Sequence, residues 1–268
     1  MKEEQDIEFL YLKTSDRGMY INFMNTMIKK VLGNDTVSDS KKIDLLSVGT
    51  QMIYEEVEFA GINKQMSNEI NDLCESMYKV ATQSSQITDY LKDYFSIENK
   101  SHTFKVAFLS ILIAKKLPWC SDRVIKILGT SAILHDIGKI KFSNNLKGKY
   151  KFELSNDELI EYNKHPEFGV ELLRGNQIIS EPILQVIYQH HECVNAVGFP
   201  NQLSGTKIYP LAKIVSLADF FSNLLEVSSK NTVESLTEFV TSPKDVLMFE
   251  PEFVRELIKC FIKDKSKE

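Results

Sequence analysis

The chain has 268 residues, of which 43% are hydrophobic and 26% charged, with a formal net charge of -5. This balance is typical of a folded globular protein and excludes a disordered or fibrous chain. The acidic balance argues against general affinity for a nucleic acid polymer or an anionic membrane. It does not exclude a phosphate-bearing substrate, because a local metal cluster can outweigh it.

The first residues, MKEEQDIEFL, are acidic and contain no apolar signal-peptide stretch. The longest apolar run, VAFLSILIA at 106–114, has about half of the residues that a membrane span needs. We therefore expect a cytoplasmic protein without a membrane span. The cysteines form no CxxC pair, so reduced thiols are expected at Cys74, Cys120, Cys193 and Cys260.

The first 65 residues have the least regular pattern. Residues 7–12, IEFLYL, fit a short strand, residues 33–42 a polar loop, and residues 41–48 either a strand or a helix. We expect residues 1–90 to form a smaller N-terminal domain with a short strand or two. It could receive a signal, dimerise or bind a signalling protein, and its sequence does not favour one of these roles.

From about residue 65 onward, apolar residues recur at helical spacing, and glycine and proline are scarce. Ser121 and Ser155 are predicted N-caps, Pro118 a helix stop, and Pro166 a first helical residue. The sequence therefore predicts a mainly α protein, with a helical bundle over 91–268. The predicted helices cover 68–95, 102–117, 121–139, 155–165, 166–175, 181–192, 209–227 and 250–265.

The segment AILHDIGKI, residues 132–140, places a histidine and an aspartate in an apolar run. Burying both groups is costly unless each is hydrogen-bonded or coordinates a metal. All histidines of the chain lie within one window of 90 residues, at His102, His135, His165, His190 and His191. This concentration indicates a multi-metal site.

Imidazoles and carboxylates together suit iron, manganese, zinc or nickel. Asp136 can bridge two cations, and Asp219 in SLADFF is another charge among apolar residues. Glu98 precedes His102 by four residues, which would put both on one helical face. Adjacent residues on a helix diverge by about 100°, so His190 and His191 are expected at neighbouring positions of a cluster rather than on one ion.

Each of these residues alone has a structural alternative. A lone His-Asp pair is weak evidence, Glu98 fits a solvated helix face better than a ligand, and Cys193 fits a small buried thiol. Taken alone, the HHE segment at 190–192 fits a metal site and a structural role about equally well. Taken together, the histidines favour the metal site.

The motifs HDIGKI, HPEFG, HHECVNAVGFP and LAKIVSLAD resemble, in order and spacing, the HD-GYP branch of the HD superfamily of metal-dependent phosphohydrolases. The resemblance covers about residues 95–268. It implies an all-helical fold with two or three divalent metals, iron first and manganese next. It also implies hydrolysis of cyclic di-GMP or a related phosphate ester through a metal-bridging hydroxide.

The resemblance assigns roles to individual residues. Asp136 and Lys139 would be catalytic, with Lys139 near the scissile phosphate, and Glu98 matches a ligand of a third metal. The implied metal ligands are His102, His135, Asp136, His165, His190, His191 and Asp219.

Two departures from the family pattern concern the substrate. Phe199 stands where the family has the tyrosine of its GYP motif, and Ala196 stands where it has a glycine. The position of a phosphate-gripping arginine is Ser228, with Lys230 close by. Lysine lacks the bidentate fork of arginine. Phe199 and Lys230 nevertheless remain candidate substrate contacts.

Three functions follow, in order of preference. The first is a metal-dependent phosphodiesterase, and the second is a weakened, metal-loaded protein that binds a nucleotide or a protein without turnover. The third is a di-iron oxygenase, which the Lys139 position and the HHE segment disfavour. Residues 143–164 lie between two ligand motifs and could form a lid.

Overall fold

The computed structural model describes residues 13, 16–34, 36–83, 87–96, 101–147, 149 and 151–262. Within these ranges the secondary structure is helical, apart from one isolated β-bridge between Asn195 and Ser204. The prediction of a mainly α protein is therefore confirmed. Residues 7–12, for which a strand was predicted, lie outside the described residues.

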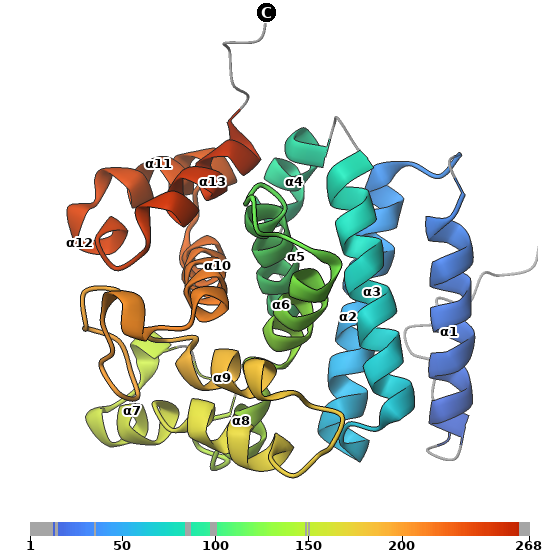
Figure 1. Cartoon of the computed structure of the whole chain (residues 1–268), viewed down its shortest axis with the longest axis horizontal. Coiled ribbons are helices and arrows are strands. Elements are labelled where there is room, and N and C mark those ends of the chain that lie inside the picture. Colours follow the sequence, from blue (N-terminus) through green and yellow to red (C-terminus); the bar gives the residue numbers. More distant parts are fainter. Residues whose placement is uncertain are drawn as a thin grey trace, which may run out of the picture.

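Three helices form the N-terminal part and lie side by side at the right of Figure 1: α1 (Arg17–Leu32), α2 (Asp39–Ala60) and α3 (Lys64–Gln83). The ambiguous segment 41–48 is helical and belongs to α2, which buries Ile43 and Leu46. The predicted helix 68–95 corresponds to α3 and to a separate α4 (Ile87–Ser96).

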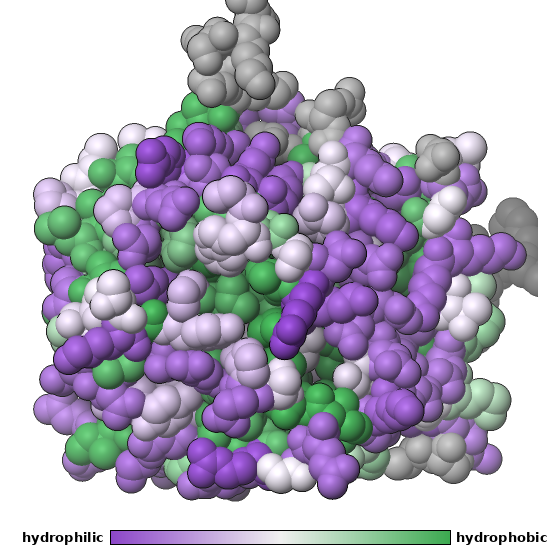
Figure 2. All heavy atoms as spheres, viewed as in Figure 1, coloured by the Kyte–Doolittle hydropathy of each residue, from purple (hydrophilic) through white to green (hydrophobic). Residues whose placement is uncertain are grey.

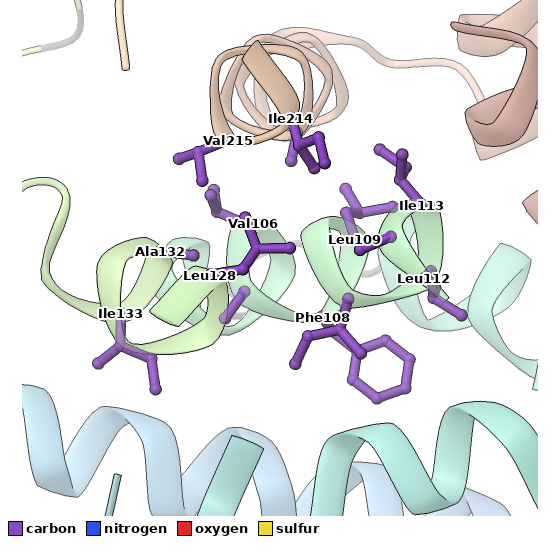
Figure 3. Close-up of a cluster of buried hydrophobic side chains, with 14 of the residues drawn as sticks. Val106, Phe108, Leu109, Leu112, Ile113, Leu128, Ala132, Ile133, Ile214 and Val215 are labelled. Atoms are coloured by element: carbon purple, nitrogen blue, oxygen red, sulfur yellow. The ribbon is translucent and has the colours of Figure 1, made fainter. Parts of the chain in front are cut away.

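The centre of the molecule is built on α5 (His102–Ala114), which packs against α6 (Asp122–Leu134) and α10 (Pro210–Val227). Figure 3 shows α5 and α6 with α10 on one side and the N-terminal helices on the other. A helix that is apolar all round is a buried one. This explains the run at 106–114, whose residues are all buried.

The remaining helices surround this centre (Figure 1). Between α6 and α10 the chain forms η2 (Ile137–Lys141), η3 (Lys151–Glu153), α7 (Asn156–Tyr162), α8 (His165–Leu173), α9 (Glu181–Gln189) and η4 (Gly205–Lys207). After α10 it forms α11 (Thr232–Thr241), α12 (Pro243–Val246) and α13 (Pro251–Phe261).

Several predicted helix boundaries are confirmed by their capping groups. The Ser121 hydroxyl accepts a hydrogen bond from the Val124 amide at the start of α6. Ser155 and Glu158 form a reciprocal capping box at the start of α7. Pro166 lies in the first turn of α8, where a missing amide hydrogen costs nothing.

One hydrophobic core extends through the described part of the chain, from Ile43 in α2 to Phe261 in α13. The helices α2 and α3 thus pack on α5 and α6 across the predicted boundary at residue 90, and that boundary stays a prediction. Hydrophilic side chains cover most of the face seen in Figure 2, with apolar ones between them. Among the described residues, no helix is long and apolar enough to cross a membrane.

Candidate metal centre

The ends of four helices meet at one place and bring all histidines of the chain together. His102 begins α5, His135 follows the end of α6, and His165 begins α8. His190 and His191 follow the last residue of α9. Two groups of potential ligand atoms result, each within 4.8 Å: Asp136 with His165, His190 and His191, and Asp136 with His102 and His135. Asp136 belongs to both.

The helix α6 ends at Leu134 rather than at the predicted residue 139, and the chain continues as the 3-10 helix η2. The reason is a close backbone contact: a Cβ at Gly138 would lie 2.0 Å from the carbonyl oxygen of His165. Only glycine permits this approach of η2 to α8. The contact places Asp136 Oδ1 at 3.3 Å from His165 Nε2.

Three of the buried imidazoles have their tautomer set by the backbone. Nδ1 of His135, His165 and His190 lies 2.7, 2.6 and 2.6 Å from the carbonyl oxygen three residues earlier. Because a carbonyl oxygen only accepts, each Nδ1 carries the hydrogen. In the neutral imidazole, each Nε2 then presents a lone pair to the cluster.

These lone pairs face one another. The Nε2 atom of His165 lies 3.1 Å from Nε2 of His190 and 3.1 Å from Nε2 of His191. Among the described residues, the buried Nε2 of His135 and Oδ1 of Asp136 have no hydrogen-bond partner. Buried acceptors that converge without a donor are costly unless a cation lies between them. The donor set therefore fits divalent metal ions.

The expectation that His190 and His191 serve different ions assumed that both lie within a helix. Since α9 ends at Gln189, the chain turns at these residues and the two rings lie with their centroids 4.1 Å apart. Both histidines belong to the same group of potential ligands. Helical divergence does not separate them here.

Asp219 in α10 connects the two groups from the opposite side. Its Oδ1 lies 3.1 Å from His102 Nε2 and 3.7 Å from His135 Nε2, and its Oδ2 lies 3.5 Å from His191 Nδ1. The amide of Asn223 donates a hydrogen bond to Oδ1 over 2.8 Å. The carboxylates of Asp219 and Asp136 thus enclose the histidines.

Glu226, which was not predicted as a site residue, contacts the second nitrogen of His102. Glu226 Oε1 and Ser222 Oγ each lie 3.1 Å from His102 Nδ1. Glu226 also forms an ion pair with Lys105, with 3.5 Å between Oε1 and Nζ. The Lys105 side chain is only 2% exposed. The available signal was the seven-residue spacing from Asp219 to Glu226, which puts both on one face of α10.

Protonation differs among the histidines of the site. At His135 the charge of Asp136 outweighs the desolvation of burial and raises the pKa to about 10, so metal binding there would release a proton. Desolvation lowers the pKa of His165 to about 3 and that of His190 to about 4, so both are neutral at pH 7. Burial alone would raise the pKa of Asp136, but His135 and Lys139 outweigh it and hold that pKa well below its ordinary value. Neutral imidazoles and an ionised carboxylate are the forms that bind metals.

Lys139 lies beside the cluster. Its Nζ is 2.5 Å from Asp136 Oδ2 and 5.3 Å from the centre of the Tyr162 ring. The side chain is 33% exposed, so the ammonium is near both the cluster and solvent.

The segment after His191 covers one side of the site. The Phe199 ring stacks on the His191 ring with centroids 4.4 Å apart. A Cβ at Gly198 would lie 2.3 Å from the His191 carbonyl oxygen, so glycine is required there. Ala196 has φ 64°, the left-handed conformation that favours the glycine of the family pattern. The loop therefore keeps its left-handed turn although the residue differs.

Other predicted residues lie elsewhere. The Lys230 ammonium forms a 2.8 Å ion pair with Glu238 of α11, and both side chains are about half exposed. Cys193 is buried and belongs to neither group of ligands, as expected. Glu98 lies outside the described residues. In the segment 143–164, Leu146, Leu154 and Tyr162 join Phe142 and Phe199 in a small hydrophobic cluster beside the centre.

The part of the chain that carries this centre is similar to a known protein family. Residues 100–224 match the HD domain family, and this span contains every histidine and aspartate of the two groups and Asp219. This span of the chain is therefore similar to an HD domain. The resemblance to the HD-GYP branch is confirmed by the relatives below.

Two curated relatives and one solved structure are similar to this chain. The cyclic di-GMP phosphodiesterase response regulator RpfG of Xanthomonas campestris pv. campestris is 34% identical over 123 residues, 45% of this chain and 32% of that protein. The 3'3'-cGAMP-specific phosphodiesterase 2 of Vibrio cholerae is 29% identical over 168 residues, 61% of this chain and 32% of the relative. The chain thus spans about a third of the length of these relatives.

The solved structure is that of Bd1817, an HDG"Y"P protein from Bdellovibrio bacteriovorus. It superposes with a TM-score of 0.76 over 92% of this chain and 80% of that chain, at 23% sequence identity. This similarity supports the fold. It covers more of the chain than residues 100–224.

Proposed function

We propose that this chain is a metal-dependent phosphodiesterase that hydrolyses a cyclic dinucleotide, cyclic di-GMP or a close relative of it. One observation carries the proposal: Asp136 is shared by two groups of buried ligand atoms whose lone pairs face one another. Such a shared carboxylate suits two cations a few ångströms apart. The names of the relatives point to the same class of substrate.

One metal would be held by Asp136 with His165, His190 and His191, and the other by Asp136 with His102, His135 and Asp219. The histidine-carboxylate donor set suits iron, manganese, zinc or nickel. The resemblance to the HD-GYP branch favours iron first and manganese next. When bound, such cations lower the pKa of water and neutralise the charge that develops on a phosphate. A third metal at Glu98 remains part of the proposal.

The protein's own groups would bind and orient the substrate. The Lys139 ammonium, near both Asp136 and solvent, would contact the phosphate and stabilise negative charge as the ester bond breaks. Phe199 stacks on His191 and would shield that side of the site from water. Its ring cannot donate the hydrogen bond of a tyrosine, so Phe199→Tyr is expected to preserve or raise kcat.

The test is hydrolysis of cyclic di-GMP and 3'3'-cGAMP by anaerobically purified, metal-reconstituted protein, followed by chromatography of the products. Turnover that chelators abolish and that falls at least 100-fold in Lys139→Ala would support the proposal. No turnover of either nucleotide by fully metal-loaded protein would refute it.

The second candidate is a metal-loaded protein that binds a nucleotide without turnover. Phe199 in place of tyrosine and the engagement of Lys230 with Glu238 favour it, because both weaken the expected grip on the substrate. Nucleotide binding measured by calorimetry, with no product after long incubation, would select this candidate over the phosphodiesterase.

A further inference from the structure

A second lysine ammonium lies beside the candidate centre, on the segment between two of its ligand motifs. The Nζ atom of Lys151, the first residue of η3, is 5.3 Å from the centre of the Phe199 ring and 5.8 Å from that of the Tyr162 ring. The Phe199 ring stacks on His191, and the Tyr162 ring lies 5.1 Å from the ring of His165. One aromatic ring thus separates Lys151 from the ligands.

The charge of Lys151 is available to an anion. Within the described ranges no carboxylate forms an ion pair with it, whereas the neighbouring Lys149 pairs with Glu158 of α7. Lys151 is exposed, while the rings below it are buried or half-buried. An ammonium over aromatic faces keeps its donors free on the solvent side.

Lys139 and Lys151 lie around the same aromatic ring. Their Nζ atoms are 5.3 and 5.8 Å from the centre of Tyr162, so their separation cannot exceed the sum of these two distances. Two cations this close suit a ligand with two negative groups. A cyclic dinucleotide has two phosphates, joined by a single ribose in each direction.

We propose that Lys151 is the specificity-determining residue that binds the second phosphate of a cyclic dinucleotide, while Lys139 contacts the phosphate at the metal centre. This inference rests on the proposed function. Lys151 would supply, from the segment before α7, the charge that the family places after the last aspartate of α10. Lys230, paired with Glu238, is not needed for that role.

The test compares a substrate that has two phosphates with one that has a single phosphodiester. Intact, metal-reconstituted protein is assayed with cyclic di-GMP and with bis(4-nitrophenyl) phosphate. For Lys151→Ala we expect KM for cyclic di-GMP to rise about 10- to 100-fold, the loss of one charged hydrogen bond, with kcat within about twofold. Its kinetics with bis(4-nitrophenyl) phosphate should not change.

Two matched variants complete the design. Lys151→Arg keeps the charge and should retain most of the affinity for cyclic di-GMP. Lys149→Ala removes a lysine two residues away, and its kinetics with both substrates should be unchanged. An unchanged KM for cyclic di-GMP in Lys151→Ala would overturn the inference. So would an equal loss with both substrates, because that indicates a general structural effect.

Failure of the proposed function gives a different result. If the metal-loaded parent protein hydrolyses neither substrate, the proposed function is wrong, and calorimetric titration with cyclic di-GMP decides the role of Lys151. Binding at least 10-fold weaker in Lys151→Ala than in Lys149→Ala supports it. Equal binding, or no binding by the parent protein, overturns it.

Discussion

The buried histidines owe their ligand geometry to the backbone that precedes them. In His135, His165 and His190 the Nδ1 hydrogen is donated to the carbonyl oxygen three residues earlier, at the end or the start of a helix. This fixes the ring and directs Nε2 to the shared site. His102 differs because side chains hold its Nδ1, chiefly Glu226.

Glu226 is therefore expected to position His102 for metal binding. In Glu226→Gln the hydrogen bond loses its charge, and we expect metal affinity to fall about 10- to 100-fold. Competition with a fluorescent chelator at pH 7 measures this affinity. Glu238→Gln, which breaks only an exposed ion pair on α11, is the control, and equal affinities in the two variants would show that Glu226 plays no such role.

Rare residue types in a narrow window made most of the centre predictable. Histidines and an aspartate are conspicuous in an apolar sequence. The structure brings all five histidines together with Asp136. Glu226 and Lys151 were missed because glutamate and lysine are common on helix surfaces. Their positions next to His102 and Phe199 depend on packing between distant elements, which spacing does not reveal.

At the scale of elements, glycines mark where backbones come closest. The predicted helix through residue 139 was too long because Gly138 meets the backbone of α8, a tertiary contact with no local signal. Capped boundaries at Ser121 and Ser155 were predictable because the capping residue acts within its own turn. Local chemistry is thus readable from sequence, and close approaches are not.

Gly129 tests the packing of α6 on α3. A Cβ at this position would lie 2.4 Å from the Cys74 Sγ atom, so Gly129→Ala is expected to lower the free energy of unfolding by about 1–3 kcal/mol. The control is Gly18→Ala in α1, where nothing lies within 4 Å and alanine should add up to about 1 kcal/mol. Urea unfolding measures both, and a Gly129→Ala protein as stable as the parent would contradict this packing.

At the scale of the whole molecule, one core joins the N-terminal helices to the helices that surround the candidate metal centre. The apolar face of α3 was predictable from the helical spacing at 68–83, but that of α2 was not, because residues 41–48 fit a strand as well as a helix. The packing partners of both helices depend on the core and were not predictable. The N-terminal helices therefore pack directly on α5, which begins at the candidate ligand His102, and on α6, which the candidate ligand His135 follows.

The cysteines report on the integrity of this core. Burial raises the pKa of Cys74 and of Cys260 to about 12, so at pH 8 both remain thiols, and only thiolates react. In the native protein we expect fast reaction with Ellman's reagent at Cys120 alone, the one cysteine that is not buried. All four should react after unfolding in guanidinium, and four fast thiols in native protein would disprove the buried core.

The shared ligand Asp136 gives the most direct test of the metal centre. The metal content of anaerobically purified, reconstituted protein is measured by mass spectrometry beside a His135→Ala/Asp136→Ala variant. Because Asp136 belongs to both groups of ligands, we expect at least two metal ions per chain in the intact protein and fewer than one in the variant. Fewer than two ions in the intact protein, or the same content in both, would contradict a two-metal centre.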